Sequence, residues 1–464
     1  MSIWLPDVTG RSGPLYRAIV EALADDVAAG RLPVGTRLPP HRDLAWRLHC
    51  TVGTIARAYA EAARRGLVDG QVGRGTYVVE PAAAPRHLHD YVAARAVEAD
   101  GVVDMAINRP SGDLSSPAVA DALRRLADRN DLGALLGYQL DGVLPRHRAA
   151  LARWAALEGV TVRPEQIICT VGGQQAILVT LAALSRPGDV ILAEELTYPG
   201  LKVAAGLLDR VVEGVAMDGQ GLCPDALDQA LRTTRARVVY CLPTNQNPTM
   251  VVMPLARRQE IIAVARRHGA VLVEDGIYAF LAESPPPSLW SLAPDCCVYL
   301  SSLSKAVAPA LRVGFVAAPE ALVNRINGNV SASTMMVPPL LGEVAAQMIE
   351  NGAAEAAMRR QAAEARERMA LARILLGEAA CPAGPAFNLW LPLPPPWRAD
   401  AFAAEAYRRG VVLAPAGSFA TTRQVPEAVR VSISAPPSHA ALRSGLKVVA
   451  ELLAAGPDGG GLMV

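Results

Sequence analysis

Lysine is almost absent from this chain. Of the 45 lysine and arginine residues, three are lysines: Lys202, Lys305 and Lys447. Arginine keeps its proton under ordinary conditions, whereas a lysine amine can lose its proton and attack a carbonyl carbon. A lysine retained in such a sequence either performs chemistry that arginine cannot, or occupies a surface position where either residue serves. The question is sharpest for Lys305, which lies in the run SSLSKAVAPALRVGF.

Other features are missing as well. The net charge is only +1, and the N-terminus, MSIWLPDVTG, lacks the basic region and apolar core of a secretory signal. The longest apolar runs, such as AILVTLAAL at 176–184, are too short to span a membrane. The seven cysteines show no CxxC spacing, which favours free thiols over disulfides or a zinc site. These absences predict a cytoplasmic protein of several domains, with no membrane segment and no metal.

Residues 1–80 have the pattern of a small DNA-binding domain. Apolar residues at helical spacing predict a helix over 14–30, and two shorter helices follow at 41–49 and 52–66. The segment 67–79, LVDGQVGRGTYVV, predicts two strands joined by a glycine-rich tip. A helix, a helix-turn-helix and a hairpin in this order indicate a winged helix.

Five residues of this domain are candidates for contacts with double-stranded DNA. Thr51 and Thr54 begin the third helix, where hydroxyls and backbone N–H groups can meet phosphates or base edges. Arg42, Arg57 and Arg74 add positive charge. The domain holds ten arginines against eight acidic residues, so a three-helix protein-interaction module stays open as the alternative.

The run RLPPHRDLAWRL…TIARAYAEAARRGLVDGQVGRGTYV resembles the DNA-binding domain of the GntR family of bacterial regulators, over about residues 12–80. The family usually places an arginine near the start of the recognition helix, where this chain has Val52 and Gly53. The resemblance implies DNA binding, with Arg57 taking over part of the base readout.

The rest of the chain has a different organisation. Residues 81–101 are rich in alanine with proline, and predict a linker. From 102 to 464, short apolar strands alternate with amphipathic helices, which is typical of an α/β fold with a mostly parallel sheet. We expect a large part over about 102–345 and a smaller α+β unit over about 346–464.

Polar residues cluster where the predicted strands end. In α/β sheets the loops at the carboxyl ends of strands bind ligands. These exits carry Gly173, Gln174, Tyr198, Asn247, Asp275, Tyr278 and Lys305. Taken singly, each suits an ordinary turn, rim or helix cap. Together they suit a ligand with a phosphate, an aromatic ring, a phenolic oxygen, a basic ring nitrogen and an aldehyde, which is pyridoxal 5′-phosphate.

The motifs GYQLDGVLPRHRAALARW, VGGQQA, NQNPT, EDGIY and SLSKAVAPALRVG resemble those of the fold-type I aminotransferases, over about residues 102–455. The resemblance implies a phosphate site built from Gly173, Gln174, Ser302 and Arg312. It also implies that Tyr198 stacks on the cofactor ring and that Asn247 and Tyr278 bind its phenolic oxygen. Asp275 would pair with the pyridine nitrogen and keep it protonated.

Three further roles follow from the same resemblance. Lys305 would be the catalytic lysine that forms the internal aldimine. Arg430 would hold the carboxylate of a substrate or effector. Tyr138 would reach a phosphate across a dimer interface, which implies a homodimer. The chain departs from common family patterns at GGQQA and at RHRAAL.

A GntR-type domain ahead of an aminotransferase-like body resembles the MocR subfamily of transcription regulators, over nearly the whole chain. This implies a pyridoxal-phosphate-dependent DNA-binding regulator that senses an amine, an amino acid or a vitamer by aldimine chemistry. Two alternatives stay open. One is a working aminotransferase with an accessory DNA-binding domain, and the other is a regulator that senses the cofactor itself.

Overall fold

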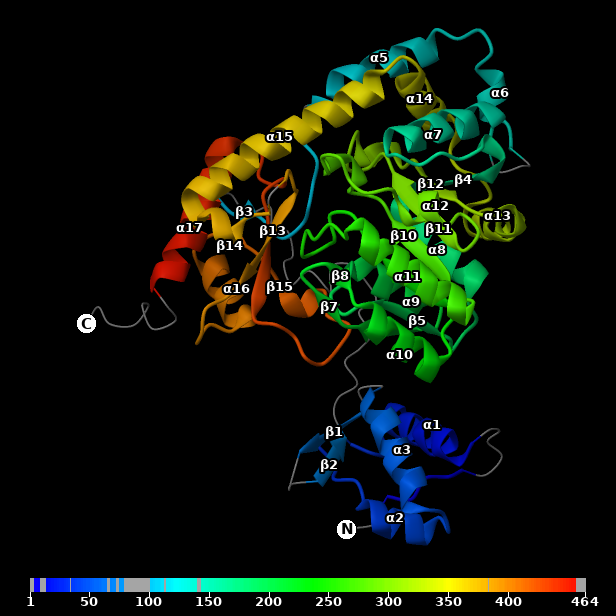
Figure 1. The fold of residues 1–464 in the computed structure, drawn as a ribbon, viewed down its shortest axis with the longest axis vertical. Helices are drawn as coiled ribbons and strands as arrows, with labels where there is room; N and C mark the ends of the chain where they lie inside the picture. Colours follow the sequence, from blue (N-terminus) through cyan, green and yellow to red (C-terminus); the bar gives the residue numbers. More distant parts are fainter. Residues whose placement is uncertain are drawn as a thin grey trace. The chain divides into compact units, whose positions relative to one another are not determined.

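The computed structural model describes residues 4–8, 14–33, 35–64, 67–71, 75–78, 101–111, 114–139, 143–382 and 384–455. The chain forms two compact units, 1–86 and 87–464 (Figure 1). The predicted linker lies outside the described residues except for Gly101, and Arg74 lies outside them too.

The first unit is the predicted winged helix. Its elements are α1 (Leu15–Ala28), α2 (His41–Arg47), α3 (Val52–Arg64), β1 (Val68–Gln71) and β2 (Gly75–Val78). The two strands pair antiparallel, so the hairpin prediction is confirmed.

One apolar face holds the first unit together. Ile55 and Tyr59 recur at helical spacing on α3 and are buried against Ile19 of α1 and Leu44 of α2. Burying one such aliphatic side chain contributes roughly 1.5–3 kcal/mol. The Thr51 hydroxyl accepts a hydrogen bond from the Thr54 N–H at 3.2 Å and so caps the start of α3.

The second unit is built on a seven-stranded sheet. The strand order is β4 (Ile167–Thr170), β12 (Gly314–Ala317), β11 (Cys297–Ser302), β10 (Val271–Asp275), β9 (Val238–Cys241), β5 (Val190–Glu194), β6 (Val211–Val215). Only β12 runs antiparallel to its neighbours, so the prediction of a mostly parallel sheet is confirmed. Sequence reasoning missed β6, because this edge strand is largely half-buried and lacks a continuous apolar run.

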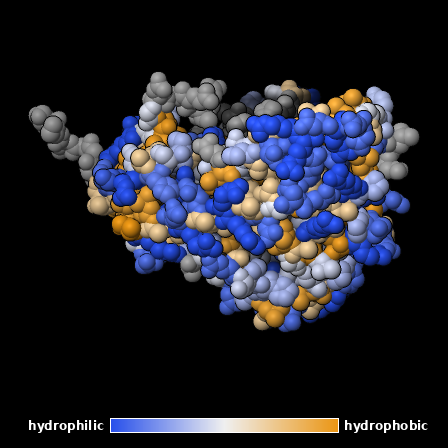
Figure 2. All heavy atoms as spheres, turned by 90° about the horizontal axis from the view of Figure 1, so that it is seen from above, coloured by the Kyte–Doolittle hydropathy of each residue, from blue (hydrophilic) through white to orange (hydrophobic). Residues whose placement is uncertain are grey.

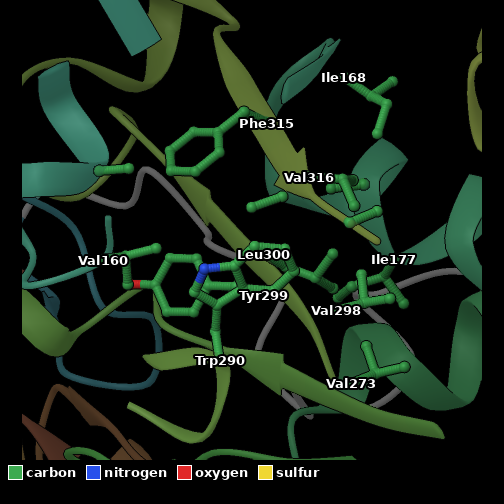
Figure 3. Close-up of a cluster of buried hydrophobic side chains, with 14 of the residues drawn as sticks. Val160, Ile168, Ile177, Val273, Trp290, Val298, Tyr299, Leu300, Phe315 and Val316 are labelled. Atoms are coloured by element: carbon green, nitrogen blue, oxygen red, sulfur yellow. The ribbon is translucent and has the colours of Figure 1, made fainter. Parts of the chain in front are cut away.

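The central strands are apolar because both faces of the sheet are covered. All residues of β4, β9, β11 and β12 are buried. Figure 3 shows part of this core, in which the ring centres of Tyr299 and Phe315 lie 6.2 Å apart. Strands covered on both sides need apolar residues at every position, which is the pattern that the sequence shows.

Helices surround the sheet. They are α5 (Ser116–Ala127), α6 (Gly133–Leu136), α7 (Pro145–Leu157), α8 (Gly172–Leu184), α9 (Pro199–Leu207), α10 (Pro224–Thr234), α11 (Leu255–His268), α12 (Leu289–Leu292), α13 (Glu320–Thr334) and α14 (Pro339–Glu350). Several begin with proline, whose fixed φ suits the first helical position. The apolar run 176–184 forms most of α8, and its buried residues explain why this helix is apolar on nearly all sides.

A smaller unit with its own core completes the fold. It contains α15 (Ala353–Leu376), α16 (Ala399–Arg408), α17 (His439–Ala455) and the antiparallel sheet β13 (Asn388–Pro392), β16 (Ala428–Ser432), β15 (Ala414–Pro415). The long helix α15 contacts both α14 and α17 and so joins the two parts (Figure 1).

The chain enters this smaller unit before it builds the large sheet. β3 (Val103–Asp104) pairs in parallel with β14 (Val411–Val412), and Met105 is buried in the smaller unit's core. Residues 103–105 therefore pack with a region that follows them by about three hundred residues. The predicted boundary near residue 345 stays a prediction.

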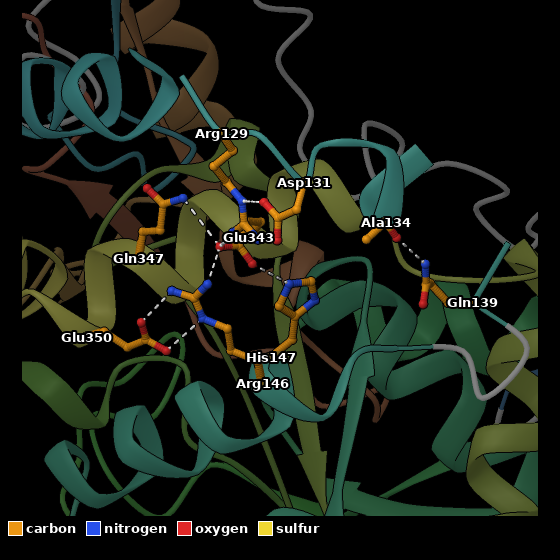
Figure 4. Close-up of polar contacts among 9 residues, drawn as sticks. All are labelled: Arg129, Asp131, Ala134, Gln139, Arg146, His147, Glu343, Gln347 and Glu350. Carbon is orange, nitrogen blue, oxygen red and sulfur yellow. Dashed lines mark hydrogen bonds and ion pairs between the residues drawn. The ribbon is translucent and has the colours of Figure 1, made fainter. Parts of the chain in front are cut away.

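A polar network ties three segments of the second unit together (Figure 4). The buried carboxylate of Glu343, on α14, accepts hydrogen bonds from Arg129 and Arg146, and His147 lies 3.2 Å from it. Arg146 also pairs with Glu350 at 2.6 Å. The unusual RHR sequence thus supplies the first turn of α7 with two side chains that bind α14.

The face in Figure 2 is largely hydrophilic, with hydrophobic side chains in small separate groups. In the part of the chain that the structure describes, no helix is both long enough and apolar enough to cross a bilayer.

Candidate functional site

A cavity of about 340 Å³ opens where the strands of the large sheet end. Ten of the eleven residues predicted for the cofactor and effector line it: Gly173, Gln174, Tyr198, Asn247, Asp275, Tyr278, Ser302, Lys305, Arg312 and Arg430. The exception is Tyr138, whose side chain is 77% exposed and does not line the cavity.

One end of the cavity is the start of α8. The N–H groups in the first turn of a helix have no partner within the helix and attract anions. Gly172 has φ +77°, and a Cβ there would lie 2.6 Å from the guanidinium of Arg312. Glycine is therefore required for Arg312 to lie beside this turn, where it donates to the Val171 carbonyl at 2.9 Å. Ser302 lies close to Gly173 on the same side.

Tyr198 stands at the next strand exit, as the residue before α9. Its hydroxyl lies 3.3 Å from Oε1 of Gln174, and the Gln174 amide donates to the Gly200 carbonyl at 2.8 Å. A Cβ on Gly200 would lie 2.2 Å from the Tyr198 ring, so only glycine leaves space for this ring orientation.

Asp275, the last residue of β10, is a buried carboxyl group. It accepts hydrogen bonds from the Tyr240 hydroxyl at 2.5 Å and from the Ile277 N–H at 3.1 Å. Burial raises the pKa of Asp275, and these two hydrogen bonds oppose that rise. Nearby, the Tyr278 hydroxyl accepts from the Asn108 side chain at 3.1 Å.

Two cationic side chains enter the cavity from opposite parts of the chain. Lys305 donates to the Asn108 carbonyl at 2.7 Å, and burial lowers the pKa of its amine to about 8, with Arg430 and Arg109 adding repulsion. Arg430 donates to Asn247 Oδ1 at 2.8 Å and to the Ala106 carbonyl. Burial lowers the pKa of Arg430 to about 10, so it still carries its charge at neutral pH.

Arg430 is held in place by an aromatic ring as well. Its guanidinium carbon lies 4.6 Å from the centre of the Phe419 ring, within cation–π distance. Its Nε is buried and has no hydrogen-bond partner among the described residues.

Sequence reasoning missed three residues that hold this site together: Asn108, Tyr240 and Phe419. None of these residues follows the carboxyl end of a strand of the large sheet. Asn108 comes from the segment that enters the smaller unit, Tyr240 lies inside β9, and Phe419 lies in a loop after β15. A buried tyrosine within an otherwise aliphatic strand was the one available signal, since its hydroxyl needs a partner.

Four of the five predicted DNA contacts lie among the described residues, and three of these four are exposed. Arg42, in the first turn of α2, is exposed, and so are Thr51 and Arg57, whereas Thr54 is half-buried. The Arg57 guanidinium lies 4.4 Å from the centre of the Tyr16 ring. Thr51 serves as the cap of α3, a structural role that sequence reasoning did not assign to it.

Comparison with known proteins gives two family matches. Residues 100–449 match the model of the family "Aminotransferase class I and II". Residues 15–78 match the model of the family "Bacterial regulatory proteins, gntR family".

Individual proteins follow the same division. The HTH-type transcriptional regulator YdeF of Bacillus subtilis is 29% identical over 452 residues, 97% of this chain and 96% of that protein. A 2-aminoadipate transaminase of Thermus thermophilus is 29% identical and covers 69% of this chain and 82% of its own.

Solved structures resemble the second unit. An archaeal alanine:glyoxylate aminotransferase has a TM-score of 0.73 at 22% identity, over 85% of this chain and 99% of its own. LysN, the α-aminoadipate aminotransferase of Thermus thermophilus, has a TM-score of 0.70 at 25% identity, over 79% and 96%. That enzyme was crystallised with N-(5′-phosphopyridoxyl)-L-leucine.

Proposed function

This chain belongs to the aminotransferase class I and II family and carries a gntR-family regulatory domain at its N-terminus, and from this premise we propose that it is a transcription regulator that binds pyridoxal 5′-phosphate and responds to an amino acid. The full-length match to a helix-turn-helix regulator supports the regulatory role. The lining of the cavity supports the cofactor and the ligand.

The residues around the cavity suit pyridoxal phosphate. When bound, this cofactor supplies an aldehyde that condenses reversibly with amines and a ring that withdraws electrons. The first turn of α8, with Ser302 and Arg312, would hold the phosphate, and Tyr198 would lie against the ring. Because the pKa of Lys305 is lowered to about 8, a reactive fraction of its amine is neutral near pH 7.

The observation that carries the cofactor proposal is Asp275. In the described part of the chain its hydrogen-bond donors are the neutral Tyr240 hydroxyl and the Ile277 N–H, and no cation pairs with it. A buried carboxylate without a cation is costly. A protonated ring nitrogen in the cavity would supply the missing positive charge.

Arg430 defines the class of effector. Arg430 lines the cavity, and its guanidinium could donate charge-assisted hydrogen bonds to a carboxylate. The amine of the same molecule would then reach the position of the Lys305 amine. We therefore propose an α-amino acid as the effector.

We also propose that the protein works as a homodimer in which Tyr138 serves the partner's cavity. Leu136 and Met335 are 66% and 64% exposed, and the Gln139 N–H donates to the Met336 sulfur at 3.3 Å, so Tyr138 belongs to an exposed apolar segment. Sedimentation equilibrium measures the mass directly, and a monomer at micromolar concentration would contradict the dimer.

The second candidate function is turnover as an aminotransferase, which the presence of Lys305, Asp275 and Arg430 in one cavity favours. Titrating the cofactor-loaded protein with amino acids, beside binding to its own upstream DNA, separates the two. A regulator changes its DNA affinity without sustained turnover. Continued conversion of an amino donor and a keto acid, with unchanged DNA affinity, would favour the enzyme.

We propose that Arg42, Thr51, Thr54 and Arg57 contact DNA, with Arg74 in the wing as a further candidate. Replacing the exposed Arg42 by alanine is expected to weaken binding and to reduce the slope of log K against log salt by about one, because one phosphate contact is lost.

The control for this test is Arg31→Ala. Arg31 is also exposed but pairs with Asp26 at 2.8 Å, so its loss should leave the salt slope unchanged. Electrophoretic mobility shifts at several salt concentrations measure both slopes. Equal slopes for wild type and Arg42→Ala would remove Arg42 from the DNA interface.

A further inference from the structure

Tyr240 is a polar residue inside the core of the large sheet. It is the third residue of β9, its side chain is fully buried, and its hydroxyl lies 2.5 Å from Oδ2 of Asp275. The other carboxylate oxygen, Oδ1, accepts from the Ile277 N–H. Neighbouring strands β9 and β10 thus place a phenol against the acid that ends one of them.

The phenol acts as the donor in this pair. Burial raises the pKa of Tyr240 well above its usual value, and the nearby Asp275 charge raises it further, so the hydroxyl keeps its proton. Hydrogen bonds from a hydroxyl to an ionised carboxylate are short and about twice as strong as neutral ones, which agrees with the 2.5 Å distance.

The surroundings of Asp275 otherwise favour its neutral form. Burial raises its pKa. The charge of Asp275 raises the pKa of the acidic groups around it, which are Glu158, Glu194, Glu274, Tyr198, Cys241, Tyr278 and Tyr299. A protonated Asp275 could not form an ion pair with a protonated ring nitrogen. The ion pair therefore needs interactions that favour the carboxylate form of Asp275. Among the described residues, the hydrogen bonds from the Tyr240 hydroxyl and the Ile277 N–H have this effect.

We propose that Tyr240 is a positioning residue that keeps Asp275 ionised and orients it toward the cavity for a protonated nitrogen heterocycle. The identity of that ligand rests on the proposed function. The effect on Asp275 itself does not, because the hydrogen bond joins two side chains of this protein. The two ideas can therefore fail separately.

The first test uses the full chain without cofactor. The carboxyl C=O stretch of Asp275 is isolated by infrared difference spectra between each protein and its Asp275→Asn counterpart, and is titrated with pH. Tyr240→Phe removes the donor and keeps the ring volume. We expect the titration midpoint of Asp275 to rise by about one pH unit or more, a tenfold change in its protonation equilibrium.

Tyr299→Phe is the matched control. Tyr299 is equally buried, but its hydroxyl lies 3.0 Å from Glu158 instead. This variant should leave the Asp275 midpoint within a few tenths of a unit. An unchanged midpoint in Tyr240→Phe, or equal shifts in both variants, would overturn the proposal. If Tyr240→Phe does not fold, 3-fluorotyrosine at position 240 should lower the midpoint, because a more acidic phenol donates a stronger bond.

The second test measures pyridoxal phosphate affinity by absorbance. In Tyr240→Phe we expect affinity to match wild type above both Asp275 midpoints and to fall progressively as pH decreases through them, reaching a loss of about tenfold below both. A loss of equal size at every pH would indicate a merely structural role and contradict the proposal. If wild type takes up no cofactor, the proposed function fails, and the infrared titration alone decides the role of Tyr240.

Discussion

Replacing Lys305 by alanine is expected to abolish the Schiff-base absorbance band of the protein-bound cofactor. Lys305 lines the cavity. The other two lysines lie elsewhere: the Lys202 amine donates to the carbonyls of Ser418 and Ala420, and Lys447 is exposed on α17. Without a covalent link, the cofactor should bind at least tenfold more weakly, about 1.4 kcal/mol. Absorbance spectra and equilibrium dialysis measure the two effects.

Two control variants sharpen this experiment. Lys305→Arg keeps a positive charge but cannot condense with an aldehyde, so it should also lose the band. Lys447→Ala should behave as wild type. DNA binding by the winged helix should survive in all three, whereas the response to an amino acid should be lost when Lys305 is changed. A visible band that persists in Lys305→Ala would overturn the assignment of this lysine.

Replacing Arg258 by alanine should have the largest effect on stability. Arg258 is completely buried on α11. It donates to the carbonyls of Met253 and Pro243, both at 2.9 Å, and to the Thr244 hydroxyl at 2.7 Å. Glu274 lies 4.0 Å away, at the edge of ion-pair distance. Removing one partner of a buried charge pair typically costs about 3–5 kcal/mol of unfolding free energy.

The cost of Arg258→Ala should depend on pH. Burial raises the pKa of Glu274 to about 7, and the charge of Arg258 opposes that rise. Without Arg258 the folded-state pKa rises further above that of the unfolded chain. A raised acid pKa removes stability as pH increases through it. The difference from wild type should therefore be smallest near pH 5 and widen above pH 7.

Urea denaturation followed by tryptophan emission measures this difference. Arg266→Ala is the control, because Arg266 lies on the same helix but is exposed and pairs with Asp295. Its loss should cost less than about 1 kcal/mol. Arg258 binds Pro243 and Thr244, which lie just before Asn247 in the chain. Equal unfolding free energies for the two variants would contradict the proposal that these hydrogen bonds stabilise the fold.

The candidate site was largely predictable because parallel strands bring their carboxyl ends to one edge. Asp275, Ser302 and Gly173 are far apart in sequence, yet each follows or ends a strand of the same sheet. Because ligands bind at such strand ends, most of the residues that line the cavity could be predicted from the sequence alone.

The remainder could not be predicted for a related reason. Asn108 reaches the cavity only because residues 103–105 join strands near residue 411, a pairing that no local pattern indicates. Phe419 and Arg430 both lie in the smaller unit, and only the tertiary fold of that unit brings the ring beside the guanidinium. Tyr138 is exposed within one chain, so whether it serves a cavity is decided by a second copy.

The two cations of the cavity share an unusual choice of partner. Arg430 donates to the carbonyl of Ala106 and Lys305 to that of Asn108, and both carbonyls belong to the first described stretch after residue 100. A ligand that engages both cations competes with this stretch of main chain for their protons. Ligand binding would thus change the hydrogen bonding of these two main-chain carbonyls. Side-chain substitutions leave these carbonyls in place, so they would not remove this effect. Amide hydrogen exchange over residues 103–111, with and without ligand, is the measurement that detects it.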